Sequence, residues 1–279
     1  MIEDSHGCID YDESGEGRTV VLVPGSCNTG AAWRPVIAQW ENSYRCVTTS
    51  LLGYGGTLER RSADDTDIAH EAVVLEAVIR RVGCPVHLVG HSFGGLTALA
   101  VALRARVPLL SLTIAEAPAL EILRHMGEYR HYLAFRKMSE SYSKAHQAGE
   151  TTAIEQMIDF YGGAGTFAAW PQRVRDYASQ TTAVNLLDWA SAYGFELTSG
   201  LLATVKIPTL VLWGEASHPA AKRANQLLGQ CIPDAAVATI AGAAHFMILT
   251  HAREVAGMIE RHMARAEGRV AAAAAVPAN

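Results

Sequence analysis

The stretch Gly-His-Ser-Phe-Gly-Gly at residues 90–95 constrains the fold of this chain more than any other. An apolar run at residues 86–89 precedes it, and a run rich in Ala and Leu at residues 96–103 follows it. This pattern predicts a strand that turns sharply into a helix, with Ser92 exposed at the tip of the turn. Residues close to the serine must lack bulk, and Gly90 and Gly94 meet that demand. Because the N-terminus of a helix favours negative charge, Ser92 is a candidate nucleophile.

Apolar runs alternate with helical patterns along most of the chain, which predicts a parallel sheet flanked by helices. Continuous apolar runs are typical of strands buried on both faces. We expect strands at residues 7–11, 19–23, 45–49, 86–89, 109–115, 209–213 and 236–240. We expect the intervening helices at residues 31–40, from Asp64 or Asp65 to Arg81, at 96–103, at 220–228 and at 252–266.

The alternation stops between residues 120 and 201, where we find helical patterns and no convincing buried strand. We therefore expect an α/β core of residues 1–119 and 202–268, a helical cap of residues 120–201, and a disordered low-complexity tail of residues 269–279. The cap segment holds 12 of the 20 aromatic residues of the chain. An aromatic lid over an exposed serine would enclose an apolar pocket, for which we expect Trp170, Trp189 and Phe246 as lining residues.

Composition excludes several classes of function. The net charge of -5 and the lack of a basic cluster argue against nucleic acid or an anionic membrane as partner. The N-terminus lacks the apolar stretch of a signal peptide, and no run is long enough to span a bilayer. The 5 cysteines are scattered, which favours reduced thiols in a cytoplasmic protein. The histidines show no metal-ligand spacing, so we expect neither metal nor cofactor, but a small-molecule substrate with an apolar portion.

A serine hydroxyl needs a base to accept its proton and a third group to orient that base. His245 stands on a loop of small residues after the last expected strand and is the predicted base. His91 is adjacent to Ser92, so its side chain must point elsewhere, and we interpret it as structural.

These residues resemble the α/β-hydrolase fold family. The resemblance rests on the turn at residues 90–95 and on four loops, at residues 24–26, 52–55, 212–215 and 242–246. It implies an eight-stranded, mostly parallel sheet with catalytic groups on loops at its C-terminal edge. It also implies backbone N–H groups of Ser26 and Phe93 as the oxyanion hole, although Pro24-Gly25 stands where the family usually has His-Gly. The side chains of Ser26 and Asn28 are possible further donors.

The resemblance leaves the triad acid open, because Ser217 occupies the position where the family commonly has a carboxylate. We favour Glu116, which ends the strand after the turn and resembles the placement in certain haloalkane dehalogenases. Glu215 is the next candidate, and Asp188 would have to approach from the cap.

The sequence therefore favours a cofactor-free serine hydrolase that cleaves a small carboxylic ester or lactone through an acyl-enzyme. Carbon–carbon bond hydrolysis and perhydrolysis use the same serine and are alternatives. A non-catalytic ligand-binding protein on the same scaffold is the alternative from another class. The oligomeric state is not predicted.

Overall fold

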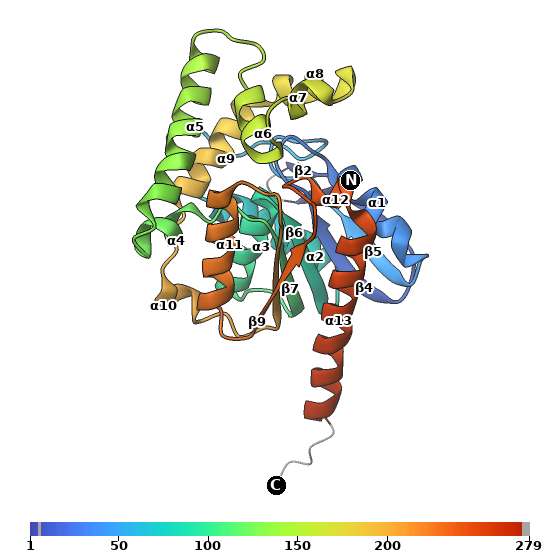
Figure 1. Cartoon of the computed structure of the whole chain (residues 1–279). Helices are drawn as coiled ribbons and strands as arrows, with labels where there is room; N and C mark the ends of the chain where they lie inside the picture. The colour runs from blue at the N-terminus through green and yellow to red at the C-terminus, as the bar shows by residue number, and fades with distance from the viewer. Residues whose placement is uncertain (5–6, 275–279) are drawn as a thin grey trace.

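A seven-stranded sheet forms the centre of the computed structural model, which describes residues 1–4 and 7–274 (Figure 1). β3 pairs antiparallel with β5, and every other neighbouring pair is parallel. In spatial order the strands are β3 (Asp12–Ser14), β5 (Tyr44–Thr48), β4 (Arg18–Val23), β6 (Val86–His91), β7 (Leu109–Ala115), β8 (Thr209–Gly214) and β9 (Ala235–Ile240).

The expected eighth strand does not join this sheet within the described residues. β2 (Gly7–Ile9) pairs only with β1 (Ile2–Asp4), as a separate antiparallel ribbon. The loop that contains Thr57 and Leu58 lies along the other side of β2. Leu58 N–H donates to the Cys8 carbonyl at 3.1 Å, and Asp10 N–H donates to Thr57 Oγ1 at 3.0 Å. These bonds satisfy backbone groups that would otherwise pair with a sheet neighbour.

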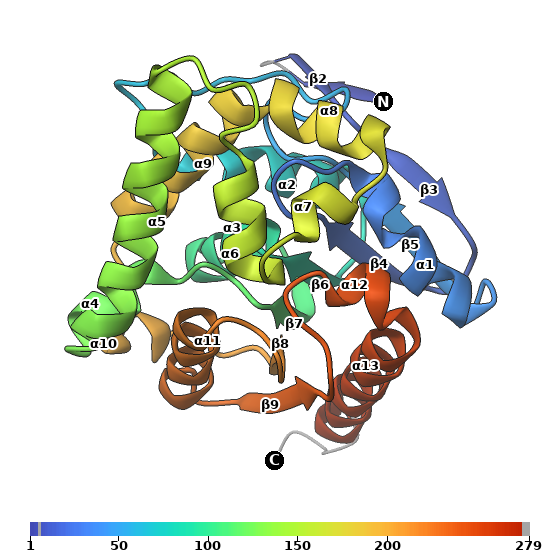
Figure 2. The same cartoon turned by 45° about the horizontal axis from the view of Figure 1, so that its top comes forward.

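The side chains of the central strands alternate between two buried cores. In β4, Val21 and Val23 pack into one apolar cluster, whereas Val20 and Leu22 pack into the other. Helices α2 (Ala69–Val82), α3 (Phe93–Arg104) and α11 (Pro219–Cys231) cover the first face, and α1 (Arg34–Ile37) and α13 (Ala252–Ala274) cover the second (Figure 2). Both faces of the central strands are thus buried, which explains why these strands appear in the sequence as continuous apolar runs. The helix expected at 31–40 is divided into η1 (Gly30–Trp33), α1 and η2 (Ala38–Trp40).

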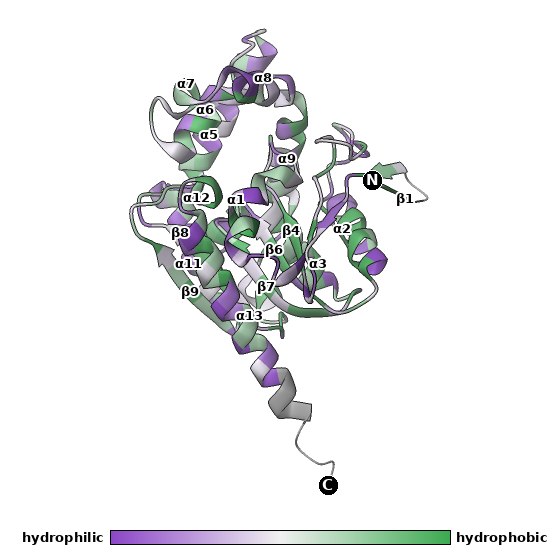
Figure 3. Cartoon of the chain, turned by 90° about the vertical axis from the view of Figure 1, so that its right-hand side faces the viewer, coloured by the Kyte–Doolittle hydropathy of each residue, from purple (hydrophilic) through white to green (hydrophobic). Residues whose placement is uncertain are grey.

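Helices fill the segment between β7 and β8. Residues 120–201, all of which the structure describes, contain no strand. Their helices are α4 (Leu120–His125), α5 (Tyr129–Gln147), α6 (Glu155–Gly162), α7 (Thr166–Ala169), α8 (Gln172–Gln180), α9 (Thr182–Gly194) and α10 (Ser199–Leu202). Figure 3 shows α5 to α8 at the end of the molecule opposite the C-terminal part of α13. We refer to residues 120–201 as the cap.

The last helix is longer than the sequence predicts. α13 continues to Ala274, so residues 269–274 are helical where we expected a disordered tail to begin. The run is rich in alanine, the residue with the highest helix propensity, which accounts for a helix in this stretch. Residues 275–279 of the expected tail lie outside the described residues. No helix in the described part of the chain is both long and apolar enough to cross a bilayer.

Strand register brings distant segments to one edge of the sheet. Val23 of β4 is level with Gly90 of β6, and His91 is level with Ala115 of β7. Gly214 of β8 is level with Ile240 of β9. Because all these strands are parallel, the loops that follow them emerge side by side, and these loops carry the candidate residues.

The turn after β6 depends on two glycines that lie against backbone. A Cβ atom at Gly90 would lie 2.2 Å from the Gly94 carbonyl oxygen, and one at Gly94 would lie 2.2 Å from the Pro24 carbonyl oxygen. Neither carbonyl can move without displacing the strand or turn that contains it, so only glycine fits at both positions.

We predict that Gly94→Ala lowers the free energy of unfolding by at least about 2 kcal/mol, because the added methyl group overpacks rigid backbone. Urea unfolding followed by circular dichroism measures the change. Gly194→Ala is the matched control, since a Cβ atom at Gly194 would meet nothing within 4 Å. Equal stability of the two variants would contradict the close packing of this turn.

Candidate active site

Ser92 stands between β6 and α3 in a backbone conformation that few residues adopt. Its φ is 54° and its ψ is -128°. Its N–H donates to the carbonyl of Ala115 at the end of β7 (2.8 Å), and its own carbonyl accepts from Gly95 N–H at 2.8 Å. A non-glycine residue in this region costs about 1–3 kcal/mol, which the surrounding strand and helix must offset. The turn thereby holds the serine at the edge of the sheet.

A hydrogen-bonded chain links Ser92, His245 and Glu116. His245 Nε2 lies 3.0 Å from Ser92 Oγ, and His245 Nδ1 lies 2.9 Å from Glu116 Oε1. His245 and Glu116 are buried, whereas Ser92 is partly exposed. A carboxylate on Nδ1 favours the tautomer whose Nε2 lone pair faces the serine hydroxyl. The arrangement can therefore accept a proton from Ser92.

The Glu116 carboxylate also receives two donors from the loop after β8. Ser217 Oγ donates to Glu116 Oε2 at 2.5 Å, and the N–H of Gly214 donates to the same oxygen at 3.1 Å. Ser217, at the position where the family commonly has its acid, thus contacts the carboxylate that replaces it. Asn225 holds the adjoining backbone, since its amide both accepts from Ala117 N–H and donates to the Ala117 carbonyl, each at 3.0 Å.

The other two acid candidates are engaged elsewhere. Glu215 is exposed, and its carboxylate accepts from Gly242 N–H at 3.1 Å. Asp188 is buried but contacts Ser26, Tyr54 and Arg61. Of the three carboxylates considered, the structure brings only Glu116 to His245.

His91 supports the loop that carries His245. Its Nε2 donates to the backbone carbonyl of His245 at 2.8 Å. Burial, with a further contribution from His245, lowers the pKa of His91 to about 3, so the ring is neutral at ordinary pH. This placement agrees with the interpretation of His91 as structural, although its Nδ1 is buried without a hydrogen-bond partner.

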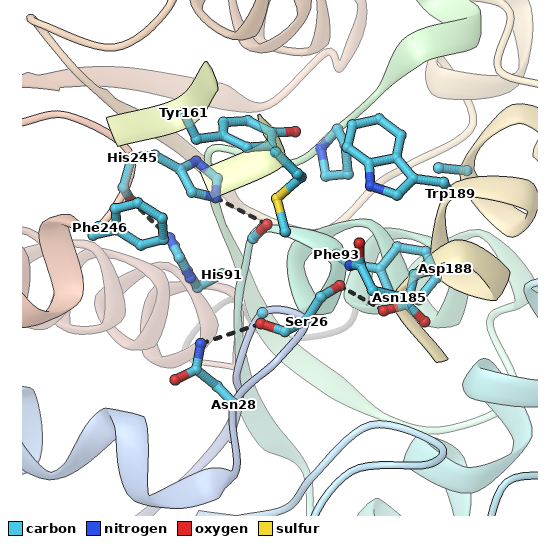
Figure 4. A pocket seen from close by; sticks show the side chains of 15 residues that line it. Ser26, Asn28, His91, Phe93, Tyr161, Asn185, Asp188, Trp189, His245 and Phe246 are labelled. Atoms are coloured by element: carbon cyan, nitrogen blue, oxygen red, sulfur yellow. Dashed lines mark hydrogen bonds between the residues drawn. The ribbon is translucent and has the colours of Figure 1, made fainter. Parts of the chain in front are cut away.

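Side chains of the loop after β4 are directed into the protein, contrary to the expectation that they add oxyanion donors. Ser26 Oγ donates to Asp188 Oδ2 at 2.6 Å, and Asn28 Nδ2 donates to the Ser26 carbonyl at 3.1 Å (Figure 4). A hydroxyl has one proton, and that of Ser26 is already used. The predicted role of Ser26 therefore falls to its backbone N–H.

Asp188 is the centre of a buried charged cluster that the sequence analysis missed. Besides the Ser26 hydroxyl, its carboxylate accepts from Tyr54 OH at 2.7 Å and from Arg61 Nη1 at 2.8 Å. The Arg61 guanidinium also lies 6.0 Å from the centroid of the Phe93 ring. Asp188 belongs to α9, so this cluster fastens the cap to the core.

The cluster contains more carboxyl groups than cations. Arg61 also contacts Glu59 at 2.8 Å and Glu71 at 3.4 Å. Burial raises the pKa of Glu71 to about 8 although Arg61 opposes the shift, and burial likewise raises the pKa of Asp188. One guanidinium thus serves three carboxyl groups, of which Glu71 is the one that burial favours in its protonated form near neutral pH. No local pattern reveals the cluster, because Asp188 lies more than a hundred residues from Ser26, Tyr54 and Arg61.

A cavity opens above Ser92, between the core loops and the cap. Its empty volume, including the part open to solvent, is about 470 Å³. Trp189 and Phe246 line it as predicted. Tyr161, which the sequence analysis did not single out, stacks on His245 with ring centroids 4.0 Å apart. The lining residues are Gly25, Ser26, Asn28, His91, Ser92, Phe93, Pro118, Met157, Tyr161, Asn185, Asp188, Trp189, Ala192, His245 and Phe246.

Trp170 is not among the residues that line this cavity, which corrects its expected role. Its ring packs edge-to-face against Phe246, with centroids 5.0 Å apart, and lies near Phe167. Trp170 directly follows the short helix α7. The described residues contain no group of three or more His, Cys, Asp or Glu side chains that could hold a metal ion.

Sequence comparison matches residues 20–258 to the model of a family described as the alpha/beta hydrolase family. The chain is 34% identical over 110 residues to a pimeloyl-[acyl-carrier protein] methyl ester esterase of Aliivibrio salmonicida, a match that covers 39% of this chain and 40% of that protein. It is 24% identical over 247 residues to a putative carbamate hydrolase, RutD, of Azorhizobium caulinodans, covering 84% of this chain and 87% of that protein.

Comparison with solved structures supports the same fold. MenH from S. aureus superposes with a TM-score of 0.74 at 17% identity, covering 92% of this chain and 99% of that chain. The enol-lactonase from Burkholderia xenovorans LB400 superposes with a TM-score of 0.71, also at 17% identity, covering 92% and 96%. At such identities the likeness establishes the fold alone.

We predict that Asp188→Asn lowers the free energy of unfolding by about 3 kcal/mol or more, because it leaves the buried Arg61 cation without its closest partner on the cap. Chemical denaturation measures the loss. The matched control is Asp176→Asn on α8, whose exposed carboxylate accepts a surface hydrogen bond from Gln172 and should shift stability by less than about 0.5 kcal/mol. A similar small shift for both variants would contradict the fastening role of Asp188.

Proposed function

The chain belongs to the alpha/beta hydrolase family, and we propose that it is a serine hydrolase that cleaves a small carboxylic ester or lactone through an acyl-enzyme. The observation that carries the proposal is the hydrogen-bonded chain from Glu116 through His245 to Ser92 at the mouth of a cavity. Such a chain is the apparatus for activating a serine nucleophile.

In the first half-reaction, Ser92 Oγ attacks the carbonyl carbon and its proton passes to His245 Nε2. The carbonyl π bond opens to give a tetrahedral oxyanion, and the imidazole becomes an imidazolium. Glu116 stabilises that cation across the 2.9 Å contact with Nδ1. The intermediate then collapses, the bond to the leaving oxygen breaks, and His245 Nε2 gives that oxygen the proton.

The oxyanion needs two donors that are in place before the reaction. Phe93 opens α3, and N–H groups in the first turn of a helix have no partner within the helix. The N–H of Ser26 is the second donor, on a loop that the Ser26–Asp188 hydrogen bond fixes. Both residues line the cavity beside Ser92.

In the second half-reaction, water attacks the acyl-enzyme. His245 removes a proton from this water, and the second oxyanion forms in the same place. Collapse breaks the bond to Ser92 Oγ, which takes the proton back from Nε2, and the free acid leaves. The aromatic side chains of Tyr161, Trp189 and Phe246 around the cavity suit a substrate with an apolar portion.

Relatives with ester and lactone names support this class of reaction, among them the methyl ester esterase and the enol-lactonase. The alternative of a non-catalytic binding protein rests on the absence of an acid at position 217. It loses its basis because Glu116 supplies the carboxylate and Ser217 donates to it.

We predict that a fluorophosphonate labels the protein once, on Ser92, because an activated serine displaces fluoride and forms a stable phosphonyl ester. Intact-mass analysis counts the labels and peptide mapping locates the site. Ser92→Ala should fold normally and take no label. Folded wild-type protein that takes no label, or takes it elsewhere, would refute the serine hydrolase proposal.

We predict that Glu116→Gln lowers kcat by at least ~10²-fold, because the amide can donate to Nδ1 and favour the wrong tautomer. Adding Ser217→Asp should restore part of the rate, since Ser217 Oγ lies 2.5 Å from Glu116 Oε2 and a carboxylate there can reach the imidazole. Hydrolysis of ethyl butyrate, followed by acid release, measures both.

Glu215→Gln is the control, because the exposed Glu215 side chain contacts Gly242 rather than His245. It should change kcat by less than about threefold. If Glu116→Gln keeps nearly the full rate while Glu215→Gln loses it, the assignment of the acid is wrong.

A further inference from the structure

We propose that the cap carries a polar subsite, formed by Asn185 and Tyr161, that binds a hydroxyl or amide group of the substrate close to its scissile carbonyl. This inference rests on the proposed function, because it places a second recognition group in the cavity above Ser92. Among the described residues that line the cavity, three polar atoms are buried without a hydrogen-bond partner. They are His91 Nδ1, Asn185 Oδ1 and the Tyr161 hydroxyl oxygen.

Two of these atoms come from the cap and the third does not. His91 belongs to the core. A Cβ atom at Gly25 would lie 3.2 Å from His91 Nδ1, so this nitrogen lies against the loop after β4, beside Ser92. Asn185 and Tyr161 project from α9 and α6, on the side of the cavity away from the sheet. They are therefore placed to contact a part of the substrate beyond the reacting carbonyl.

Asn185 lies on the stripe of α9 that faces the serine. Asn185, Asp188, Trp189 and Ala192 follow the spacing of one helix face, and all four line the cavity. The Asn185 side chain is 2% exposed, and its Oδ1 has no partner. Its neighbour Asp188 is fully engaged with Ser26, Tyr54 and Arg61. Asn185 is thus a buried amide that the fold itself does not use.

Tyr161 presents a hydroxyl with the same property. Its ring stacks on His245, and Figure 4 shows its hydroxyl directed away from the imidazole, toward the side where Trp189 lies. The residue is 4% exposed and the hydroxyl oxygen has no partner. Burial raises the pKa of Tyr161 well above its ordinary value, so the hydroxyl keeps its proton and can donate.

An unpartnered polar group in a buried site costs roughly 1–3 kcal/mol, which a ligand can recover by completing the hydrogen bond. The amide oxygen of Asn185 accepts, and the Tyr161 hydroxyl can donate as well as accept. A ligand group that both donates and accepts, such as a hydroxyl or a secondary amide, can complete a hydrogen bond with either residue. The surrounding Met157 and Ala192 offer apolar contact to the remainder of the substrate, and Trp189 adds ring surface and an indole N–H donor.

The test compares esters that differ only by hydroxyl against methyl. Ethyl β-hydroxybutyrate and ethyl isovalerate form the pair with the change in the acyl part, and hydroxyethyl butyrate and propyl butyrate form the pair with the change in the alcohol part. We expect kcat/KM to favour the hydroxyl ester by at least about tenfold in one of the two pairs. A site built to bind a hydroxyl rejects the isostere that lacks it.

Two variants assign that preference to the proposed residues. Tyr161→Phe removes one oxygen and keeps the ring, and Asn185→Leu replaces the amide by an apolar group of similar size. Each should lower the ratio of kcat/KM within the preferred pair by about fivefold or more. Met157→Leu, an exchange of one apolar lining residue for another, is the control and should leave the ratio within about twofold.

The free protein provides a second readout that separates a binding role from a structural one. Because the Tyr161 hydroxyl has no partner, Tyr161→Phe should leave Tm unchanged or raise it. A clear loss of Tm, or ratios that neither variant moves in either pair, would overturn the subsite. Failure of the proposed function has a different signature, which is absence of fluorophosphonate labelling at Ser92 and no turnover of any of the four esters.

Discussion

The buried carboxylate of Glu116 ties together three loops that come from different parts of the chain. It accepts from His245 on the loop after β9 and from Ser217 and Gly214 on the loop after β8, while its own backbone follows β7. Burying this carboxylate without hydrogen-bond donors would cost a large amount of free energy. Its burial therefore depends on all three donors together. The position of the imidazole over Ser92 therefore depends on parallel strands that end at the same level.

Most of the fold could be predicted from the sequence because the sheet is buried on both faces. The strands β4 to β9 appear as apolar runs, and the turn at Ser92 appears as glycines that a tight backbone requires. The resemblance to the α/β-hydrolase family is confirmed, whereas its implied eighth strand is not found in the described sheet. The candidate residues Ser92, His245 and Glu116 could be predicted from the order of the strands, because that order determines which loops lie together at one edge of the sheet.

What the sequence did not predict depends on contacts between residues far apart in the chain. The contacts of Asp188 could not be predicted from the sequence, because its partners Tyr54 and Arg61 lie more than a hundred residues away. Trp170 and Trp189 could not be distinguished from the sequence, whereas in the structure Trp189 lines the cavity and Trp170 packs on Phe246 instead. The helical tail to Ala274 was missed for a different reason, since low complexity suggested disorder although alanine propagates a helix.

The stripe of α9 has a consequence for how such a protein can change over evolutionary time. Asp188 fixes the rotational phase of the helix through contacts with the core. Asn185 and Ala192 line the cavity from the same face, whereas Trp189 lines it and also packs on the rings of Phe135 and Tyr193. Substitutions at Asn185 and Ala192 can therefore alter the shape and polarity above the serine while Asp188 keeps the helix in place. The wall of the cavity can thus drift one side chain at a time while the core loops below it are inherited unchanged.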